Sequence, residues 1–520
     1  MKKLLMAVFC AFAVFAAGAD QVMPNRQIAN VQMLRNALRL RHGIYLGGMS
    51  AQDMQYLPIN MKYLLTAVDA ANEEINGYPA TDFANSEYAT RQAVNADTVV
   101  TAMEDLVGKV WPFVATTVPD ADYFNFEISA TGTFCVDWGD GTEEECRYHD
   151  TLDTQGYYHA YDQQGEYKIR LRGRATGYTA QDMALDKPAT ITFWWNNSLA
   201  KIDGNLAHIF PTLEDGTNPL FFFTFAFCDN LTGEIPENLF KGHTGSPSTA
   251  MFMGLFYGDH RLTGEIPENM FATFSGRTNW AAFAKVFAEC SGLTGSIPEK
   301  LFASIESEPG NYTFMGTFLN CSGLTGSIPE KLFAGIKGEP EAGEMLFWET
   351  FAGCTNLSGE IPAGLFSGIT GQPGYSMFEG TFAYCENLTG IGGPLFANMS
   401  GIPQDRAYYS TFESCVGLKG DIPDGMFGDL DCDEPSRDNA PRMQVEYCQV
   451  GADAFYNTFY GCSGLDGHSA TALAPDGNYY PLYDFNFAHD DWNFLGMYCG
   501  ASSLEDEDEI PCGFSCGCEA

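Results

Sequence analysis

Apolar and polar positions follow a pattern that returns about every 31 residues through the second half of the chain. The clearest copy, CSGLTGSIPEKLFA, occurs twice without change, at residues 290–303 and 321–334. Successive anchoring leucines are separated by 31, 31, 31, 33, 31, 30 and 47 residues. Such a period predicts a solenoid, because each unit can bury its apolar face only against the next unit. The anchoring leucines are Leu231, Leu262, Leu293, Leu324, Leu357, Leu388, Leu418 and Leu465.

Each unit contains a short segment of strict alternation. In Leu231-Thr232-Gly233-Glu234-Ile235 the period of two predicts a strand, with the leucine and isoleucine inward and the threonine and glutamate outward. The proline that follows ends the strand and favours a helical turn. A second motif places Phe314 and Phe318 four residues apart, which predicts one shared face of a short helical turn.

The outward strand positions form the predicted binding surface. They are small, polar and rich in hydroxyl groups, which suits hydrogen bonding to a glycan or a polar protein. Each of them taken alone is better explained as a solvated strand position. The predicted ligand-binding residues are Thr232, Glu234, Thr263, Glu265, Thr294, Ser296, Thr325, Ser327, Ser358, Glu360, Lys419 and Asp421.

The first 190 residues differ in pattern. Residues 1–19 have two lysines, an apolar run and a small-residue end, which predicts a secretory signal peptide. Residues 20–120 carry apolar positions at helical spacing and predict a helical N-terminal region. Residues 121–190 alternate around a Gly-Asp-Gly turn and predict a small β domain. The solenoid is assigned to residues 191–515 as eight to nine units, and a cysteine-containing tail to residues 516–520.

Two of these regions resemble known families. The register of cysteine, leucine and Ile-Pro over residues 221–515 resembles the BspA-like leucine-rich repeat proteins of bacterial surfaces. Departures are Asp259 in place of a cysteine, Ile-Gly-Gly-Pro in the sixth unit and the loss of Ile-Pro in the eighth. CVDWGDGT with His159-Ala160-Tyr161 resembles a polycystic kidney disease (PKD)-type domain, which implies an immunoglobulin-like sandwich. The expected fold class is thus α+β: a leucine-rich-repeat-like solenoid preceded by a small β-sandwich and a helical region.

The charge limits the partners. The chain has 27 basic and 67 acidic side chains, a net charge of −40, so nucleic acid and anionic lipid surfaces are excluded as partners. This acidity is explained by solubility or by a cationic ligand, with solubility favoured. After removal of the predicted signal peptide, no segment is apolar and long enough to span a membrane.

The 16 cysteines fit an oxidising compartment. The cysteine column of the repeats is interpreted as buried thiols rather than as disulfides between units, because free cysteine is among the most buried residue types. The disulfide candidates are Cys432 with Cys448, which flank the insertion in the 47-residue period, and Cys135 with Cys146, which flank the β turn.

Neither a metal site nor a catalytic constellation is indicated. Asp137 and Asp140 carry the carboxylates that calcium prefers, but the calcium-loop spacing is absent and a turn-forming role is favoured. The sequence lacks the Gly-x-Ser-x-Gly and His-Glu-x-x-His motifs, and no cofactor is expected.

The resemblance to the BspA-like family implies a non-enzymatic adhesion protein, secreted or at the cell surface, that binds an extracellular protein or glycan. The alternatives are a self-assembling structural component of the cell envelope and, less favoured, a secreted glycan hydrolase. The first predicts binding to a ligand, the second a mass that depends on concentration, and the third the release of sugars.

Overall fold

The computed structural model describes residues 112–179, 188–306, 308, 310–340, 344–430, 450–473, 478–484, 491–511 and 514–515. The chain divides into two compact units, Met1–Phe113 and Val114–Ala520, and nearly all described residues belong to the second. The predicted signal peptide, most of the predicted helical region, the Cys432–Cys448 pair and the tail at 516–520 lie outside the described residues. Among the described residues, no helix is long and apolar enough to cross a membrane.

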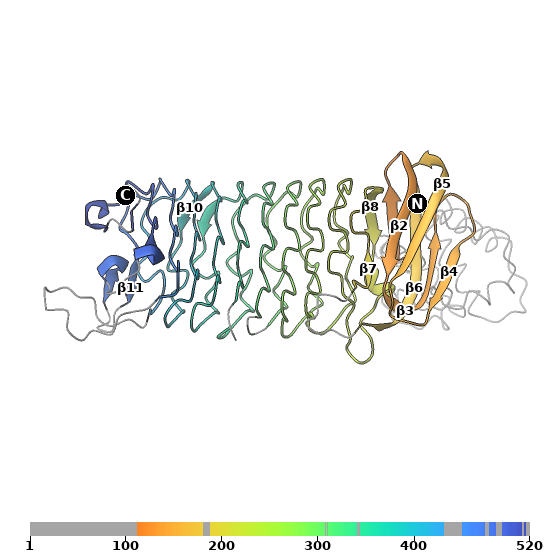
Figure 1. Ribbon diagram of the computed structural model, residues 1–520, viewed down its shortest axis with the longest axis horizontal. Helices are drawn as coiled ribbons and strands as arrows, with labels where there is room; N and C mark the ends of the chain where they lie inside the picture. Colours follow the sequence, from red (N-terminus) through yellow and green to blue (C-terminus); the bar gives the residue numbers. More distant parts are fainter. Residues whose placement is uncertain are drawn as a thin grey trace, which may run out of the picture. The chain divides into compact units, whose positions relative to one another are not determined.

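Two β-sheets form the first part of the described chain (Figure 1). One sheet has the order β4-β3-β6-β1-β8 and the other the order β5-β2-β7. Buried aromatic side chains of β2 and β5 pack on the inner face of the smaller sheet, where the rings of Phe126 and Tyr157 stack at 4.8 Å between centroids. The strands are β1 (Phe113–Thr117), β2 (Ala121–Ile128), β3 (Ala130–Asp137), β4 (Glu145–His149), β5 (Gln155–Gly165), β6 (Lys168–Tyr178), β7 (Ile191–Thr192) and β8 (Leu199–Gly204).

The sheets continue directly into the repeat units. The segment after β7 donates backbone hydrogen bonds to the first unit, from Phe193 to Thr224 at 2.7 Å and from Trp195 to Ala226 at 3.0 Å. On the other sheet, the carbonyl of Ala200 in β8 accepts a hydrogen bond from the Thr232 amide at 2.8 Å. The repeat units therefore extend both sheets, and the core of the β domain runs into the core of the repeats.

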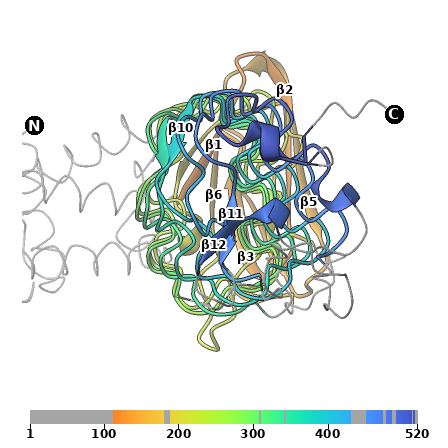
Figure 2. The ribbon, with the colours of Figure 1, turned by 90° about the vertical axis from the view of Figure 1, so that its left-hand side faces the viewer.

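Successive units lie side by side between β8 and β11 (Figure 1), and they superimpose when viewed along their direction of succession (Figure 2). Their outward segments pair in parallel, as β9 (Gly359–Ile361) with β10 (Leu388–Ile391) or as single bridges such as Gly233 with Leu262. The remaining elements are the antiparallel pair β11 (Thr471–Leu473) and β12 (Tyr479–Pro481), with the 3-10 helices η3 (Leu206–His208), η4 (Leu482–Asp484), η5 (Asp491–Phe494) and η6 (Glu507–Glu509).

The aromatic motif of each unit forms a row of overlapping β-turns, which we call a turn row. In the row at 314–321, the amide of Thr317 bonds the carbonyl of Phe314 at 3.2 Å, and the Phe318 amide bonds the next unit at 2.9 Å. Gly316 and Asn320 take left-handed backbone angles, with φ of 57° and 56°. The turn rows comprise residues 221–228, 252–259, 283–290, 314–321, 347–354, 378–385, 408–415 and 455–462.

The expected fold class is therefore wrong for the described residues. They contain no α-helix, and the expected helical turn at Phe314 and Phe318 is a turn row. Named strands occur in only a few units, so the repeats are not the regular strand-and-helix solenoid of a leucine-rich repeat. The physical reason is that alternate amides of the turn row donate to carbonyls of the neighbouring unit. In an α-helix, these amides would donate to carbonyls of the same segment.

Stacked rings fill the interior of the units. Phe314 lies between Phe283 and Phe347, at 5.9 and 5.8 Å between centroids and with interplanar angles of 6° and 5°. A second column runs through the fifth residue of each turn row, as in Phe318 and Phe351 at 5.6 Å. Stacked aromatic pairs add to the stability that burial alone provides, so we expect these columns to stabilise the interfaces between successive units.

A column of thiols accompanies the rings. The Cys321 thiol donates to the carbonyl of Phe287 in the preceding unit at 2.9 Å, and the Cys354 thiol donates to Phe318 at 3.0 Å. Burial raises the pKa of the Cys321 thiol well above its usual value, which keeps the donor proton in place. The prediction of buried thiols is confirmed for Cys228, Cys290, Cys321, Cys354, Cys385, Cys415 and Cys462.

Asp259 occupies a cysteine position in this column. It is fully buried, its Oδ1 accepts the Cys228 amide at 2.8 Å, and its Oδ2 has no hydrogen-bond partner. Burial raises the pKa of this carboxyl well above its usual value, although the bond from Cys228 acts in the opposite direction. The carboxyl therefore keeps its proton to a higher pH in the folded protein than in the unfolded chain.

Replacing Asp259 by cysteine is expected to raise the free energy of unfolding at pH 7 by about 1 to 2 kcal/mol, because an unpartnered buried oxygen is removed. Since the folded pKa is raised, the wild type loses stability as pH rises above about 4, and the gain should grow over that range. Denaturant unfolding at pH 5 and pH 7.5 under reducing conditions measures it. The exposed Asp120→Asn, whose charge is not among those acting on Asp259, is the control, and a less stable Asp259→Cys protein would contradict the prediction.

Candidate functional site

The predicted strand-face residues lie along the outward edge of the repeat units. Of the twelve, Thr232 and Ser358 are half-buried and the other ten are exposed. Leu262 and Ile266, on either side of the Thr263–Glu265 segment, are buried. The structure thus brings the twelve residues onto one surface, which we call the strand face.

Backbone hydrogen bonds fix the register of the strand face. The amides of Thr263, Thr294 and Thr325 donate to the glycine carbonyls of the preceding units at 2.9, 2.8 and 2.8 Å. Equivalent side chains are therefore spaced by one unit, about 4.8 Å for paired strands.

In two of the Leu-Thr-Gly segments, the glutamate of the preceding unit leaves room only for glycine. A Cβ on Gly264 would lie 2.7 Å from Cγ of Glu234, and one on Gly295 would lie 2.6 Å from Cγ of Glu265. Both glycines also take left-handed angles, with φ of 79° and 77°. The glutamate side chains consequently lie along the surface, over the next unit.

The hydroxyl groups are oriented by the backbone. Thr232 donates through Oγ1 to the Ala200 carbonyl at 3.2 Å, and Thr294 and Thr325 donate to the preceding glycine carbonyls at 3.3 and 3.2 Å. Their protons are thus directed at the protein, which leaves oxygen lone pairs for a ligand. Together with the carboxylates, they make the strand face mainly a surface of hydrogen-bond acceptors.

The acidic turn of the β domain is occupied by internal contacts. Asp137 pairs with Arg170 at 2.8 Å and accepts the Gly139 amide at 2.9 Å. Asp140 accepts the Thr142 amide at 3.0 Å and contacts His159 Nε2 at 2.7 Å. These bonds support the interpretation of the aspartates as turn-forming residues.

A disulfide joins Cys135 and Cys146 across β3 and β4, the pairing that the sequence placed at this hairpin. Both sulfur atoms lie near a carboxylate oxygen of Glu144. The sulfurs are bonded to each other, so this cluster offers no thiolate to a metal ion.

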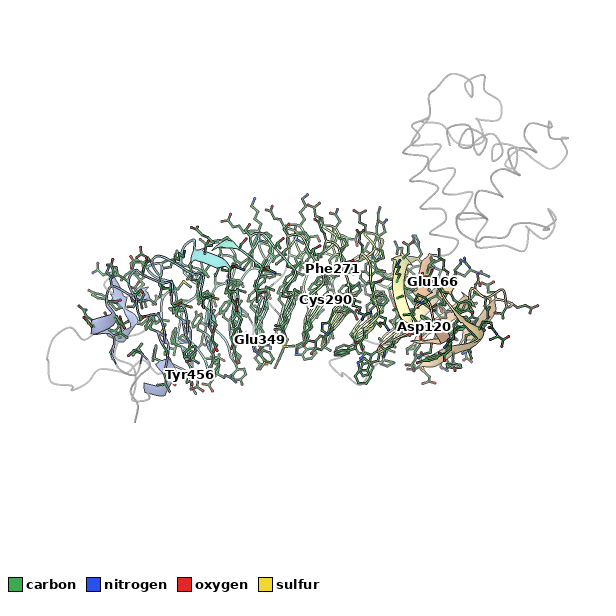
Figure 3. All side chains as sticks on the ribbon, turned by 90° about the horizontal axis from the view of Figure 1, so that it is seen from above. Asp120, Glu166, Phe271, Cys290, Glu349 and Tyr456 are labelled. Carbon is green, nitrogen blue, oxygen red and sulfur yellow. A yellow bond between two sulfur atoms is a disulfide. The ribbon has the colours of Figure 1, made fainter. Side chains whose placement is uncertain are left out.

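The structure also shows a surface that sequence reasoning missed. The outward sides of the turn rows carry aromatic and charged side chains, and the labelled Glu349 and Tyr456 lie on this side of the units while Cys290 and Phe271 lie inside (Figure 3). Near β7, Trp194 and Trp195 are 54% and 65% exposed. In the sequence, the adjacent Trp194 and Trp195 were the available sign of this surface, but they precede the first repeat that could be recognised.

Comparison with known proteins finds no matching family model, no matching curated protein and no matching solved structure. The properties of the strand face therefore rest on this chain's own residues.

Proposed function

We propose that this protein is an exported, non-enzymatic binding protein, secreted or held at the cell surface, that recognises an extracellular ligand through the strand face. The observation that carries the proposal is the unbroken register of acceptor groups from Thr232 to Glu360, one set per unit. A ligand that follows the units meets equivalent groups at a constant spacing, which favours an extended ligand over a small molecule.

The chemistry of the strand face narrows the ligand. Carboxylates of Glu234, Glu265 and Glu360 and the threonine oxygens accept hydrogen bonds, so the ligand must supply donors. Hydroxyl groups of a glycan, or lysine and arginine side chains of an extracellular protein, meet this requirement. The net charge of −40 adds a long-range attraction for a basic protein.

The test is an array of glycans and extracellular-matrix proteins probed with the chain lacking residues 1–19. The Glu234→Ala, Glu265→Ala, Glu360→Ala triple variant is expected to weaken binding at least about tenfold, equivalent to about 1.4 kcal/mol. The reason is that three exposed acceptors are lost from one surface. Affinity measured by surface plasmon resonance gives the size of the effect.

A matched control removes the same charge elsewhere. Glu237, Glu299 and Glu330 are exposed and lie beyond the strand segments, so their triple alanine variant should bind within about twofold of wild type. Equal weakening by both triple variants would show that only net charge matters. A blank array, with a mass that rises with concentration in sedimentation, would replace the proposal by the self-assembling envelope component.

A further inference from the structure

A row of aromatic side chains crosses from the β domain to the repeat units on the side of the turn rows. We call it the aromatic strip and define it as Trp194, Trp195, Phe223, Phe227 and Tyr257. The tryptophans are exposed and the other three rings are half-buried. Ring centroids lie 5.4 Å apart for Trp194 and Trp195, 5.9 Å for Trp195 and Phe227, and 4.7 Å for Phe227 and Tyr257.

Backbone bonds hold the strip in the left-handed conformation that recurs through the turn rows. Trp195, Phe223 and Phe227 take left-handed backbone angles, with φ of 57°, 50° and 57°. Bulky residues rarely adopt this region, and they persist there only where the surroundings impose it. Here the Trp195 amide donates to Ala226 at 3.0 Å, and the Phe227 amide donates to Tyr257 at 2.7 Å.

The rings of Phe223 and Phe227 lie over glycines of the next unit. A Cβ on Gly254 would lie 2.4 Å from Cε1 of Phe223, and one on Gly258 would lie 2.6 Å from Cδ1 of Phe227. Each ring therefore covers backbone that a side chain would otherwise occupy. This arrangement lays the rings along the surface instead of letting them stand out from it.

The strip continues onto the smaller sheet of the β domain. β7 pairs with β2 at Thr192 and Glu127, and Nδ2 of the Asn196 side chain donates to the Asn125 carbonyl at 2.6 Å. On the same sheet, Tyr158 is 63% exposed and stacks on Tyr123 at 5.9 Å. The exposed rings thus extend over β5, β2, the segment after β7 and the first two turn rows.

Polar groups border the tryptophans. Asn197 is exposed two residues after Trp195, and its carbonyl accepts the Asn230 side chain at 2.9 Å. Arg261 donates to Asn230 Oδ1 at 3.1 Å. This chain of amide and guanidinium groups starts two residues after Trp195 and retains further donors for a ligand.

We propose that the aromatic strip binds a neutral polysaccharide, with sugar rings stacked on the exposed Trp194 and Trp195, whose planes are inclined to each other by 40°. The C–H groups on the face of a sugar ring carry partial positive charge and are attracted by the negative face of an aromatic ring. The sugar hydroxyls then reach the polar border at Asn197 and Arg261. Exposed rings next to polar groups fit this ligand, whereas an anionic polymer or lipid surface would be repelled by the charge of −40.

The strip is separate from the strand face, so the proposal does not depend on the function proposed above. The probes are insoluble cellulose, mannan and chitin in sedimentation assays, and their soluble hexasaccharides in calorimetry, with the chain lacking residues 1–19. Wild type is expected to bind at least one of the three. The Trp194→Ala, Trp195→Ala variant should then bind at least about tenfold more weakly, in the range expected for lost aromatic anchors.

Three variants make the result specific. Trp195→Phe keeps an aromatic ring and should bind within about threefold of wild type, and it guards against a folding defect in the double variant. Tyr148→Ala removes a ring that is 75% exposed on the other sheet and should leave binding unchanged. The strand-face triple variant should also retain polysaccharide binding. Absence of binding by wild type, or equal binding by wild type and a folded double variant, would overturn the proposal.

Discussion

Replacing Phe314 by alanine is expected to lower the free energy of unfolding by about 4 kcal/mol, the usual cost of deleting a buried ring. Phe314 is fully buried and contacts rings on every side of the column. Its centroid lies 5.9 Å from Phe283, 5.8 Å from Phe347 and 4.7 Å from Phe333. Because each unit contacts only its neighbours, the gap weakens both interfaces of one unit. Denaturant unfolding followed by circular dichroism measures the change.

Tyr384→Ala is the control for this experiment. Tyr384 is an aromatic residue of the turn row two units further along the chain, but it is 49% exposed and its hydroxyl donates to Glu413 at 2.9 Å. Its replacement should change stability by no more than about 0.5 kcal/mol. Similar losses for Phe314→Ala and Tyr384→Ala would show that the ring columns are not what holds the units together.

Acidification is expected to destabilise the protein through His243, and His243→Ile should remove that part of the effect. His243 is fully buried, with Nδ1 3.0 Å from the Phe240 carbonyl and Nε2 2.7 Å from the Phe210 carbonyl. Burial lowers the pKa of His243 to about 4; the two carbonyls favour the charged ring, and nearby His208 opposes it. The unfolded chain therefore takes up a proton near its usual pKa of about 6.5, whereas the folded protein does so only near 4.

The sign follows from this difference. The stabilising contribution of neutral His243 is complete above about pH 6.5 and is lost as pH falls towards 4. From pH 7 to pH 4.5 the wild type should lose about 2 kcal/mol more than His243→Ile. Isoleucine suits the position because Ile305 and Ile336 occupy it in later units, both buried. Unfolding curves at both pH values give the comparison.

His260→Gln provides the matched control. His260 is exposed and its Nδ1 contacts the Glu289 carbonyl at 2.7 Å. The free energy of unfolding of this variant should change with pH as that of the wild type does, because the His260 ring is exposed in the folded protein. If His243→Ile lost as much stability on acidification as wild type, the buried ring would not be the titrating group.

Local alternation predicted the strand face well. Leu262 and Ile266 are buried and Thr263 and Glu265 are exposed, because side chains on an extended chain point alternately to opposite sides. The same reasoning placed Cys135 opposite Cys146, since a short turn between extended segments brings its flanks together. Both results depend only on residues close in sequence.

The turn rows show where sequence reasoning stopped. Phe314 and Phe318 are four residues apart, and over eight residues a period of four from successive turns is hardly distinguishable from the 3.6 of a helix. The choice between them depends on whether the amides bond within the segment or to another unit. Here the amides of Phe314 and Phe318 bond the next unit, about thirty residues later in the chain.

The sequence by itself determined that the chain repeats, which residues of each unit face inward, and that its field is strongly negative. These properties follow from period, alternation and charge count. The tertiary structure alone decided that the units are rows of turns continuous with two β-sheets, that Trp194 and Trp195 are exposed, and that Trp195 takes a left-handed backbone angle. The reason is physical: left-handed angles and bonds between units become favourable only when a neighbouring unit supplies the partner for each amide.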